Sequence, residues 1–284
     1  MLLKKERSKR SKPRLDDKIL TSWNALMLKG LVDAYRYLGN QEYLSLALKN
    51  ASFIQKEMVK KDHSLYRNHK HGKSTINAFL EDYATLIDAY ISLYEATFDE
   101  QWLQNAKRLA DYAHQHFFDK DSGMYFFTSD EDRSLIRRSI ETNDNVISSS
   151  NSIMANNLFK LDKLYHGKGY GAIAEQMLKN VQQDFDKRAQ GFANWLNLVL
   201  YLNQDFYEIA LVGPSFKAMG QKIGTAYIPN SIVVGTTGKS DLELLQNRQV
   251  PGKTLAYVCI EGACKLPVST SGEVLAQVGY PEQD

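Results

Sequence analysis

Three short clusters of acidic and amide side chains could carry out proton-transfer chemistry. Asp16 and Asp17 form the first cluster, Glu81 and Asp82 the second, and residues 144–151 the third. Two carboxyl groups placed together can serve as general acid and general base. A carboxylate at a helix start is more often a cap, because it accepts hydrogen bonds from the free N–H groups there. Each cluster lies beside the predicted start of an apolar helix, and this repetition favours a shared site.

The second cluster gives the clearest signal. We predict a helix over residues 75–97, which places Glu81 and Asp82 inside its second turn rather than at its boundary. A buried carboxylate without a partner destabilises a protein by several kcal/mol. Glu81 and Asp82 are therefore expected to be ion-paired or functional, whereas Asp16 or Asp17 could simply cap the first helix.

The elements that position these clusters follow an alternating pattern of helices. A helix that is apolar on nearly all sides is expected to be enclosed, and a helix with one apolar stripe to lie outside. A unit of one inner and one outer helix recurs about every 60 to 70 residues, which is typical of an array or toroid of helical hairpins. The fold class is therefore mainly α, a partial (α/α) hairpin toroid of about seven helices. The expected inner helices are 17–38, 75–97 and 151–165, the outer ones are 41–60, 100–117 and 171–185, and a further helix covers 191–202.

Composition divides the chain into three parts. Residues 1–14 form a strongly basic tail, residues 15–203 the helical domain, and residues 204–284 a small α/β appendage with strand-like β-branched runs. Within the helical domain we expect a polar, histidine-containing loop over residues 63–73. Alternating segments around turn residues predict a short hairpin between residues 119 and 147, with the runs MYFFTS and SLIRRS as its arms.

Charge and composition argue against several classes of partner. The formal net charge of +2 gives no global reason to bind nucleic acid. The sequence has no apolar run of the roughly 20 residues needed to span a bilayer, so no membrane partner is expected. No apolar signal segment follows the basic start. With only two cysteines present, a cytoplasmic location is expected.

The sequence gives no support for a cofactor or a metal site. Cys259 and Cys264 could supply only two of the four ligands of a zinc site, and we expect them to be buried structural thiols rather than a redox pair. His63, His69 and His71 have spacings that suit no standard metal motif, so a solvated loop is favoured. Phosphate-cradling glycine loops and nucleophile elbows are absent from the sequence.

Five ordered segments carry a resemblance to a known family. They read PRLDDKILTSWNALM from Pro13, FLEDYATLIDAYISLYEATFDEQWL from Phe79, GMYFFTSDEDRSLI from Gly123, DNVISSSNS from Asp144 and AYVCIEGACKLPV from Ala256. The chain resembles the C-terminal part of the spermatogenesis-associated, thioredoxin-domain proteins, whose bacterial members include the YyaL-like proteins. This resemblance implies a thioredoxin-like domain followed by an (α/α)6 toroid of the six-hairpin glycosidase and sugar 2-epimerase type. The chain is similar only to the later half of that toroid and to the tail.

The resemblance also implies where a site would lie. In such a toroid the inner helices run parallel, so their starts meet at one mouth of the ring, where these folds bind sugars. We expect Asp17, Asp82 and Glu81 to be catalytic, with Asp17 and Asp82 facing a common cavity and the pKa of at least one raised by desolvation. Trp23 and Tyr83 could stack on a sugar ring, although a core role is favoured for each. The expected substrate-binding residues are Asp16, Trp23, Asn24, Tyr83, Asp144, Asn145, Ser149 and Asn151.

Two functions remain open at this point. The first is a carbohydrate-active or sugar-binding toroid of glycosidase-like or epimerase-like type, with a saccharide as ligand and no cofactor. The second is a non-catalytic fragment or protein-interaction domain. Half a ring leaves apolar inner-helix surface uncovered, so we expect a homodimer to cover the open side.

Overall fold

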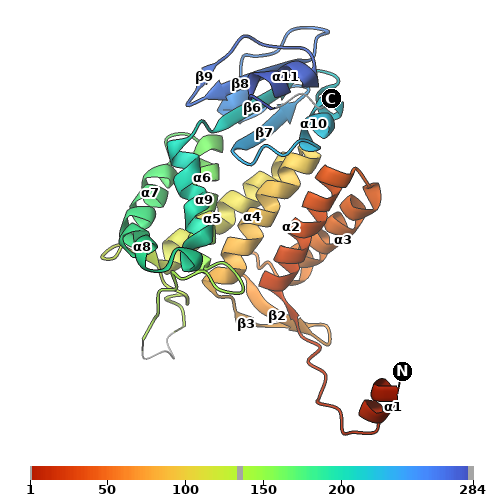
Figure 1. Cartoon of the computed structure of the whole chain (residues 1–284), viewed down its shortest axis with the longest axis vertical. Helices are drawn as coiled ribbons and strands as arrows, with labels where there is room; N and C mark the ends of the chain where they lie inside the picture. Colours follow the sequence, from red (N-terminus) through yellow and green to blue (C-terminus); the bar gives the residue numbers. More distant parts are fainter. Residues whose placement is uncertain (1, 133–136, 281–284) are drawn as a thin grey trace.

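A computed structural model describes residues 2–132 and 137–280 of the chain (Figure 1). Seven helices of eleven residues or more occupy the described part of the segment between Thr21 and Asn203. They form successive hairpins in which α2, α4, α6 and α9 lie side by side, while α3, α5 and α7 lie outside them. The mainly α, partial toroid expected from the sequence is confirmed. The bounds are α2 (Thr21–Leu38), α3 (Gln41–Glu57), α4 (Leu80–Thr97), α5 (Glu100–Phe117), α6 (Ser150–Leu164), α7 (Tyr170–Val181), the short α8 (Phe185–Arg188) and α9 (Ala193–Asn203).

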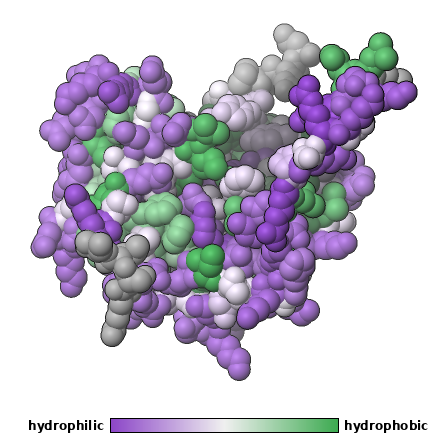
Figure 2. Space-filling model, turned by 90° about the horizontal axis from the view of Figure 1, so that it is seen from below, coloured by the Kyte–Doolittle hydropathy of each residue, from purple (hydrophilic) through white to green (hydrophobic). Residues whose placement is uncertain are grey.

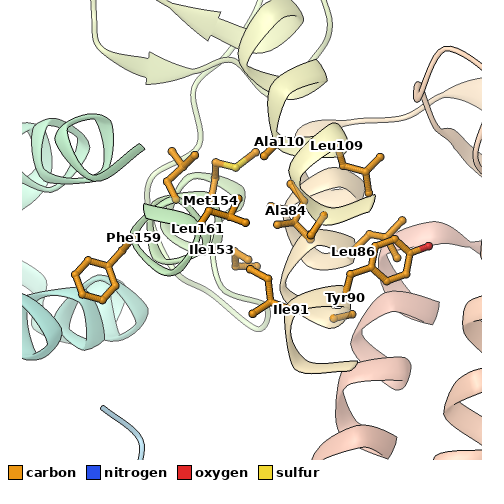
Figure 3. Close-up of a cluster of buried hydrophobic side chains, with 14 of the residues drawn as sticks. Ala84, Leu86, Tyr90, Ile91, Leu109, Ala110, Ile153, Met154, Phe159 and Leu161 are labelled. Atoms are coloured by element: carbon orange, nitrogen blue, oxygen red, sulfur yellow. The ribbon is translucent and has the colours of Figure 1, made fainter. Parts of the chain in front are cut away.

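Helix α4 is the centre of the hydrophobic core. Thirteen of its eighteen residues are buried, because α2, α5 and α6 all pack against it. Figure 3 shows its side chains extending in two directions: Leu86 and Tyr90 point toward α2 and α3, whereas Ala84 and Ile91 lie toward α6. A helix that is apolar on nearly all sides can be stable in water only if neighbours cover it in this way.

The outer helices bury a single stripe, as their sequences predict. In α5 the buried residues recur at helical spacing, and charged or amide side chains occupy the opposite face. The Asp99 carboxylate caps this helix by accepting a hydrogen bond of 3.0 Å from the backbone N–H of Gln101. The buried stripe of α5 consists of Leu103, Ala106, Leu109, Ala110, Ala113 and Phe117.

Helix α2 departs from its predicted burial. Its sequence is apolar on most sides, yet Trp23 is 62% exposed and Met27 is 60% exposed. The buried residues of α2 face α3 and α4, α10 (Phe216–Gly224) contacts the C-terminal end of α2 through Tyr35, and the side that carries Trp23 and Met27 is exposed. The prediction of a fully enclosed first helix is therefore wrong, because α2 is the first helix of the arc and has an inner neighbour on one side only.

Two inner helices begin later than the sequence pattern suggests. Residues before them form the antiparallel sheet β1-β2-β3, made of β1 (Ile19–Leu20), β2 (Tyr66–Lys70) and β3 (Lys73–Asn77). Helix α2 therefore starts at Thr21 rather than near Asp17, and α4 starts at Leu80 rather than near Thr75. The predicted polar loop over residues 63–73 is instead largely a β-hairpin, in which the backbone groups of the two strands pair with each other.

The segment between α5 and α6 contains the expected short hairpin, built from other residues than predicted. Strand β4 (Phe118–Asp119) pairs with β5 (Met124–Tyr125), so MYFFTS contributes only its first two residues. The second predicted arm, SLIRRS, lies partly outside the described residues. Its last residue accepts a hydrogen bond of 2.7 Å from the backbone N–H of Phe127.

The residues after α9 form a mixed four-stranded sheet with the order β7-β6-β8-β9. Helix α10 joins the parallel strands β6 and β7, and α11 packs against β8 and α10. This layer meets the end of α4 through Phe98, whose ring lies where a Cβ atom on Gly220 would have to go. The bounds are β6 (Tyr207–Val212), α10 (Phe216–Gly224), β7 (Ser231–Thr236), β8 (Leu255–Ile260), β9 (Ala263–Cys264) and α11 (Ser271–Gln277).

Two features lie at the ends of the chain. The basic tail contains helix α1 (Leu2–Ser8), which buries no residue and projects away from the body in Figure 1. At the other end, Cys259 and Cys264 form a disulfide between β8 and β9, and Cys264 is exposed. The expectation of two buried structural thiols is therefore wrong, because the β8–β9 register places the two residues directly opposite each other.

Candidate functional site

The starts of the inner helices gather at one end of the helical body. This is the lower end in Figure 1, and Figure 2 views the molecule from that side, where hydrophilic residues predominate and apolar residues are interspersed. The clusters of Glu81 and Asp82 and of residues 144–151 both lie at this end, at the starts of α4 and α6. The parallel arrangement of inner helices thus brings two of the three clusters to the same face.

Asp82 ties the starts of two helices together. It is the third residue of α4, and its carboxylate accepts a hydrogen bond of 2.9 Å from the backbone N–H of Phe79. The other carboxylate oxygen accepts a second bond of 2.9 Å from the backbone N–H of Ser22, in the first turn of α2. One side chain therefore satisfies a free N–H group at each of two helix starts, where the positive ends of the helix dipoles also favour a negative charge.

Arg67 of β2 supplies the partner that these buried acids require. Its Nη1 atom donates to Asp82 Oδ2 and to Glu81 Oε1, at 3.0 Å in both cases. The guanidinium also lies 4.3 Å from the centre of the Phe79 ring, so its flat face is covered by an aromatic group. Glu81 accepts a further bond of 3.2 Å from the Ser22 hydroxyl. The expectation that Glu81 and Asp82 would be paired is met, although Asp82 lies at the helix boundary and not in the second turn.

The two acids differ in exposure. The Asp82 side chain is fully buried, and burial raises its pKa to about 6, although Arg67 and the two backbone N–H groups favour the charged form. The Glu81 side chain is 21% exposed, so it reaches the surface while remaining bound to Arg67. The site therefore contains one enclosed carboxyl group that titrates near neutrality and one carboxyl group that a ligand can approach.

Asp16 and Asp17 do not join this pair. They lie on the extended segment before β1, where Asp16 forms an ion pair of 3.2 Å with Lys18 and Asp17 contacts Lys70 and His71. The hydrogen bond to the Lys70 ammonium lowers the pKa of Asp17, and that to Lys18 lowers the pKa of Asp16. Strand β1 separates Asp17 from the start of α2, and the pKa of Asp17 is lowered rather than raised.

The third cluster is held together by a second shared carboxylate. Asp144 Oδ1 accepts hydrogen bonds from the Ser149 backbone N–H, at 2.9 Å, and from the Ser152 hydroxyl, at 2.6 Å. Asp144 Oδ2 accepts a bond of 2.8 Å from the backbone N–H of Asn194, at the start of α9. Asp144 therefore connects the starts of α6 and α9 in the same way that Asp82 connects those of α2 and α4.

Other residues of this cluster anchor the hairpin that precedes α6. The Asn151 side chain exchanges two hydrogen bonds of 2.9 Å with the backbone of Tyr125, and it is fully buried. Ser149 caps α6 by accepting a bond of 3.2 Å from the Ser152 N–H. Asn145 is exposed, and its backbone N–H donates to Ile147 O. Ser150 donates to the Glu141 carboxylate through both its N–H and its hydroxyl.

The two aromatic candidates have opposite environments. Tyr83 is fully buried, stacks on Tyr112 and accepts a hydrogen bond of 2.9 Å from the backbone N–H of Leu65, so its core role is confirmed. Trp23, for which a core role was also favoured, is exposed beside Ser22 and is free to contact a ligand. Asn24 is half-buried and donates to Leu20 O, which closes the turn that leads from β1 into α2.

Arg67, Glu141 and Asn194 are the site residues that the sequence reasoning missed. Each is separated from its partner by 9 to 50 residues in the chain, and none belongs to a recognisable spacing motif. A signal for Arg67 did exist, because a buried acid requires a cation and Arg67 lies in the β2–β3 hairpin that precedes α4.

Neither a metal-binding cluster nor a membrane-spanning helix is found among the described residues. Within residues 2–132 and 137–280, no group of three or more His, Cys, Asp or Glu side chains is placed to hold a metal ion. Within the same residues, none of the helices combines the length and the apolar character needed to cross a bilayer.

Comparison with known proteins identifies a relative that covers most of this chain. Human spermatogenesis-associated protein 20 is 27% identical to this chain over 291 residues, an alignment that covers 94% of the chain and 37% of the human protein. The chain thus spans little more than a third of that relative's length. The resemblance seen in the five sequence segments is confirmed by this match.

Solved structures agree with the toroid architecture. A GH76 α-mannanase of Bacteroides thetaiotaomicron superposes with a TM-score of 0.53 and 16% identity, covering 82% of this chain and 66% of the mannanase. The unsaturated glucuronyl hydrolase of Bacillus sp. GL1 gives a TM-score of 0.53 at 15% identity, covering 68% and 62% of the two chains. At these identities the likeness concerns the fold.

A family model assigns the helical body directly. The model described as glycosyl hydrolase family 76 matches residues 21–191, which include α2, α4 and α6 and the residues at their starts. This match extends over more than half of the sequence. The chain therefore belongs to glycosyl hydrolase family 76.

Proposed function

We propose that this chain is the saccharide-handling part of a carbohydrate-active protein, with its ligand bound at the end of the body where the inner helices begin. One observation carries the proposal: two carboxyl groups, Glu81 and Asp82, share the Arg67 guanidinium, and only Glu81 is accessible from outside. Family membership and the fold support a saccharide as the ligand class.

Of the three acids expected to be catalytic, Glu81 is the one assigned to direct proton transfer. A glycosidase needs one carboxyl group as acid and a second as base or nucleophile, about 5 to 5.5 Å apart in retaining enzymes and about 6.5 to 9.5 Å apart in inverting enzymes. Glu81 Oε1 and Asp82 Oδ2 each lie 3.0 Å from the same Arg67 nitrogen, so this pair of oxygens cannot be farther apart than twice that distance. This upper limit excludes the inverting spacing for these two oxygens, but it does not make Asp82 the second catalytic group.

Asp82 is assigned a positioning role. Its oxygens already accept bonds from two backbone N–H groups and from Arg67, so it offers no free face to a sugar. By fixing Arg67 it fixes Glu81, and by joining α2 to α4 it sets the position of Trp23 next to Ser22. Trp23 is assigned to stacking on a sugar ring, because it combines an apolar face with exposure. Asp16 and Asp17 are assigned to the rim of the site.

A thermal-shift and hydrolysis panel tests this proposal. The purified chain is mixed with α-mannan oligosaccharides, unsaturated glucuronyl disaccharides and maltose as the unrelated saccharide. A ligand present at 100 times its Kd should stabilise the folded protein by about 2.7 kcal/mol. Binding of either of the first two classes, with none of maltose, supports the proposal. No stabilisation and no hydrolysis with any saccharide at millimolar concentration would contradict it.

Matched variants locate the site within the chain. Glu81→Gln removes the accessible carboxylate and should abolish hydrolysis while the protein still folds, because Arg67 keeps its ion pair with Asp82. Glu42→Gln is the control, since Glu42 is an exposed acid in the first turn of the outer helix α3. Equal activity in both variants would remove Glu81 from the mechanism.

One observation favours the second function, a protein-interaction domain. The outward side of α2 exposes Trp23, Leu26 and Met27, an apolar set that a covered helix would bury. A second copy of the chain is the predicted occupant, and sedimentation velocity over a hundredfold concentration range tests it. A monomer at all concentrations would contradict the homodimer, and it would leave the saccharide proposal unaffected.

A further inference from the structure

The β8–β9 hairpin carries a disulfide whose two sulfur atoms differ in access. Cys259 on β8 is fully buried, whereas Cys264 on β9 is exposed, as are all the residues from 261 to 267. Leu266, two positions after Cys264, is 84% exposed. A reagent arriving from solvent therefore meets Cys264 and cannot reach Cys259.

This cross-link closes a short loop between strands that already pair. Its two residues are direct partners in the antiparallel register, and the ladder is also closed by a hydrogen bond of 2.9 Å from the Lys265 N–H to Val258 O. The stabilisation expected from a disulfide grows with the length of the loop that it closes, and here only four residues lie between the cysteines. A disulfide that closes so short a loop contributes less to stability than one across a long loop would.

A cation is placed against both sulfur atoms. Arg248 Nη1 lies 3.1 Å from Cys264 Sγ and 3.5 Å from Cys259 Sγ. The Tyr257 hydroxyl donates a hydrogen bond of 3.0 Å to the Arg248 carbonyl, and the guanidinium lies 4.9 Å from the centre of the Tyr257 ring. Tyr257 and Cys259 are two residues apart on β8, so they share one face of the strand. The strand that carries the buried cysteine thus also holds the cation.

A positive charge at this position favours thiolate over thiol. The thiolate is both the attacking and the leaving species in disulfide exchange, and a neighbouring arginine lowers the pKa of a thiol. One acid lies nearby: the buried Glu208 is the cross-strand partner of Cys259, but its carboxylate accepts from the Gly262 N–H and lies 3.7 Å from Lys163. Arg248 is therefore the charged group that contacts the sulfur atoms.

We propose that Cys259 and Cys264 form a redox-active pair that exchanges with a dithiol. A thiolate of the incoming dithiol attacks Cys264 Sγ, the Cys259–Cys264 bond breaks, and Cys259 leaves as a thiolate beside Arg248. The second thiol of the reagent then attacks the reagent sulfur that is bonded to Cys264, and Cys264 is released as a thiolate. The dithiol loses two electrons and two protons to become a disulfide, and the protein disulfide gains them to become two thiols.

Kinetics of reduction by dithiothreitol test the proposal. The full chain, folded and without denaturant, is mixed with dithiothreitol, samples are quenched with an alkylating reagent, and the two cysteines are counted by mass. Complete reduction within minutes, with an unchanged circular dichroism spectrum, is expected. A disulfide that is reduced only after unfolding would overturn the proposal, as would two free thiols that form no disulfide in oxidised glutathione.

Substitution of Arg248 distinguishes a disulfide that is activated for exchange from one that reacts only because it is exposed. Arg248→Gln should slow reduction, because the departing Cys259 thiolate loses the guanidinium that stabilises it and a thiol of higher pKa leaves more slowly. Arg248→Lys keeps the charge and should retain most of the rate. Arg108→Gln, on the exposed face of α5, is the control and should not change the rate. Equal rates in all three variants would show that Arg248 takes no part.

Single-cysteine variants identify the attacked sulfur. Cys259→Ser leaves Cys264 exposed and should form a mixed disulfide with oxidised glutathione, visible as the added mass of one glutathione. Cys264→Ser leaves only the buried Cys259 and should remain unmodified at least tenfold longer. The opposite order would assign the attack to Cys259 and overturn a mechanism in which Cys259 is the leaving thiolate.

Discussion

Helices α2 and α4 are similarly apolar in sequence but differ in how much of their surface is buried. Both are eighteen residues long and apolar on most sides, yet α4 buries thirteen residues and α2 buries six. The difference comes from their places in the arc, since α4 has an inner helix on each side and α2 has one on a single side. An apolar pattern therefore indicates which surface a helix can bury, and the elements packed against the helix determine how much of that surface is buried.

Truncation of a core residue should give the largest contrast between the two helices. Leu86→Ala on α4 removes a fully buried side chain at the position labelled in Figure 3 and should lower the free energy of unfolding by about 2 to 5 kcal/mol. Met27→Ala on α2 should change it by no more than about 0.5 kcal/mol, because this side chain is largely exposed. Urea denaturation measures both. Similar losses in the two variants would mean that α2 is covered in solution.

The pH dependence of stability should report on Asp82, the carboxyl group that joins the two helices. Its pKa is raised from 3.8 to about 6 in the folded protein, so the folded state holds the proton more tightly than the unfolded state. This contribution to stability is fully present below about pH 3.8 and is lost as the pH rises through about 6. The shift corresponds to about 3 kcal/mol at most.

Comparison with two asparagine variants isolates that contribution. Asp82→Asn should lack it, so the difference in unfolding free energy between the parent chain and this variant should change between pH 4 and pH 7. Asp17→Asn is the control, because the pKa of Asp17 is lowered and its contribution has the opposite sign, being lost as the pH falls. Parallel stability curves for the parent and Asp82→Asn would rule out a raised pKa.

At fixed neutral pH, Asp82→Asn should also weaken the junction of α2 and α4 directly. Both oxygens of Asp82 accept hydrogen bonds, so an amide group would place an N–H donor against another donor. One unsatisfied buried group should lower stability by about 1 to 3 kcal/mol. A melting temperature equal to that of the parent chain would argue that the two helices are held by packing alone.

The smallest effect on stability should come from the exposed side of α2. Replacing Trp23 and Met27 together by glutamine should leave the unfolding free energy within about 1 kcal/mol of the parent value, because both side chains are largely exposed. Binding of an apolar fluorescent dye should fall in this double variant if the surface is open. Unchanged dye fluorescence, together with lost self-association, would instead place a second copy on this side.

The amino-acid sequence by itself determined the helical body, the order of inner and outer helices and the sheet-containing tail. These features depend on periodicity within about 20 residues, which a single segment records completely. The family resemblance was likewise available, because it rests on runs of adjacent residues. The acidic and amide clusters were located correctly at the starts of α4 and α6.

Tertiary structure alone decided what those clusters do. The hydrogen bonds that Asp82 accepts from Ser22, Asp144 from Asn194 and Glu81 from Arg67 join residues 14 to 60 positions apart, and no spacing rule encodes such separations. The same holds for β1 and β3, which contain residues predicted to be helical. They form strands because their backbone groups pair with those of β2. Burial of α2 and exposure of Cys264 also depended on which elements were present to cover them. Contacts between distant segments arise from packing of the whole chain, so the local pattern could not fix them.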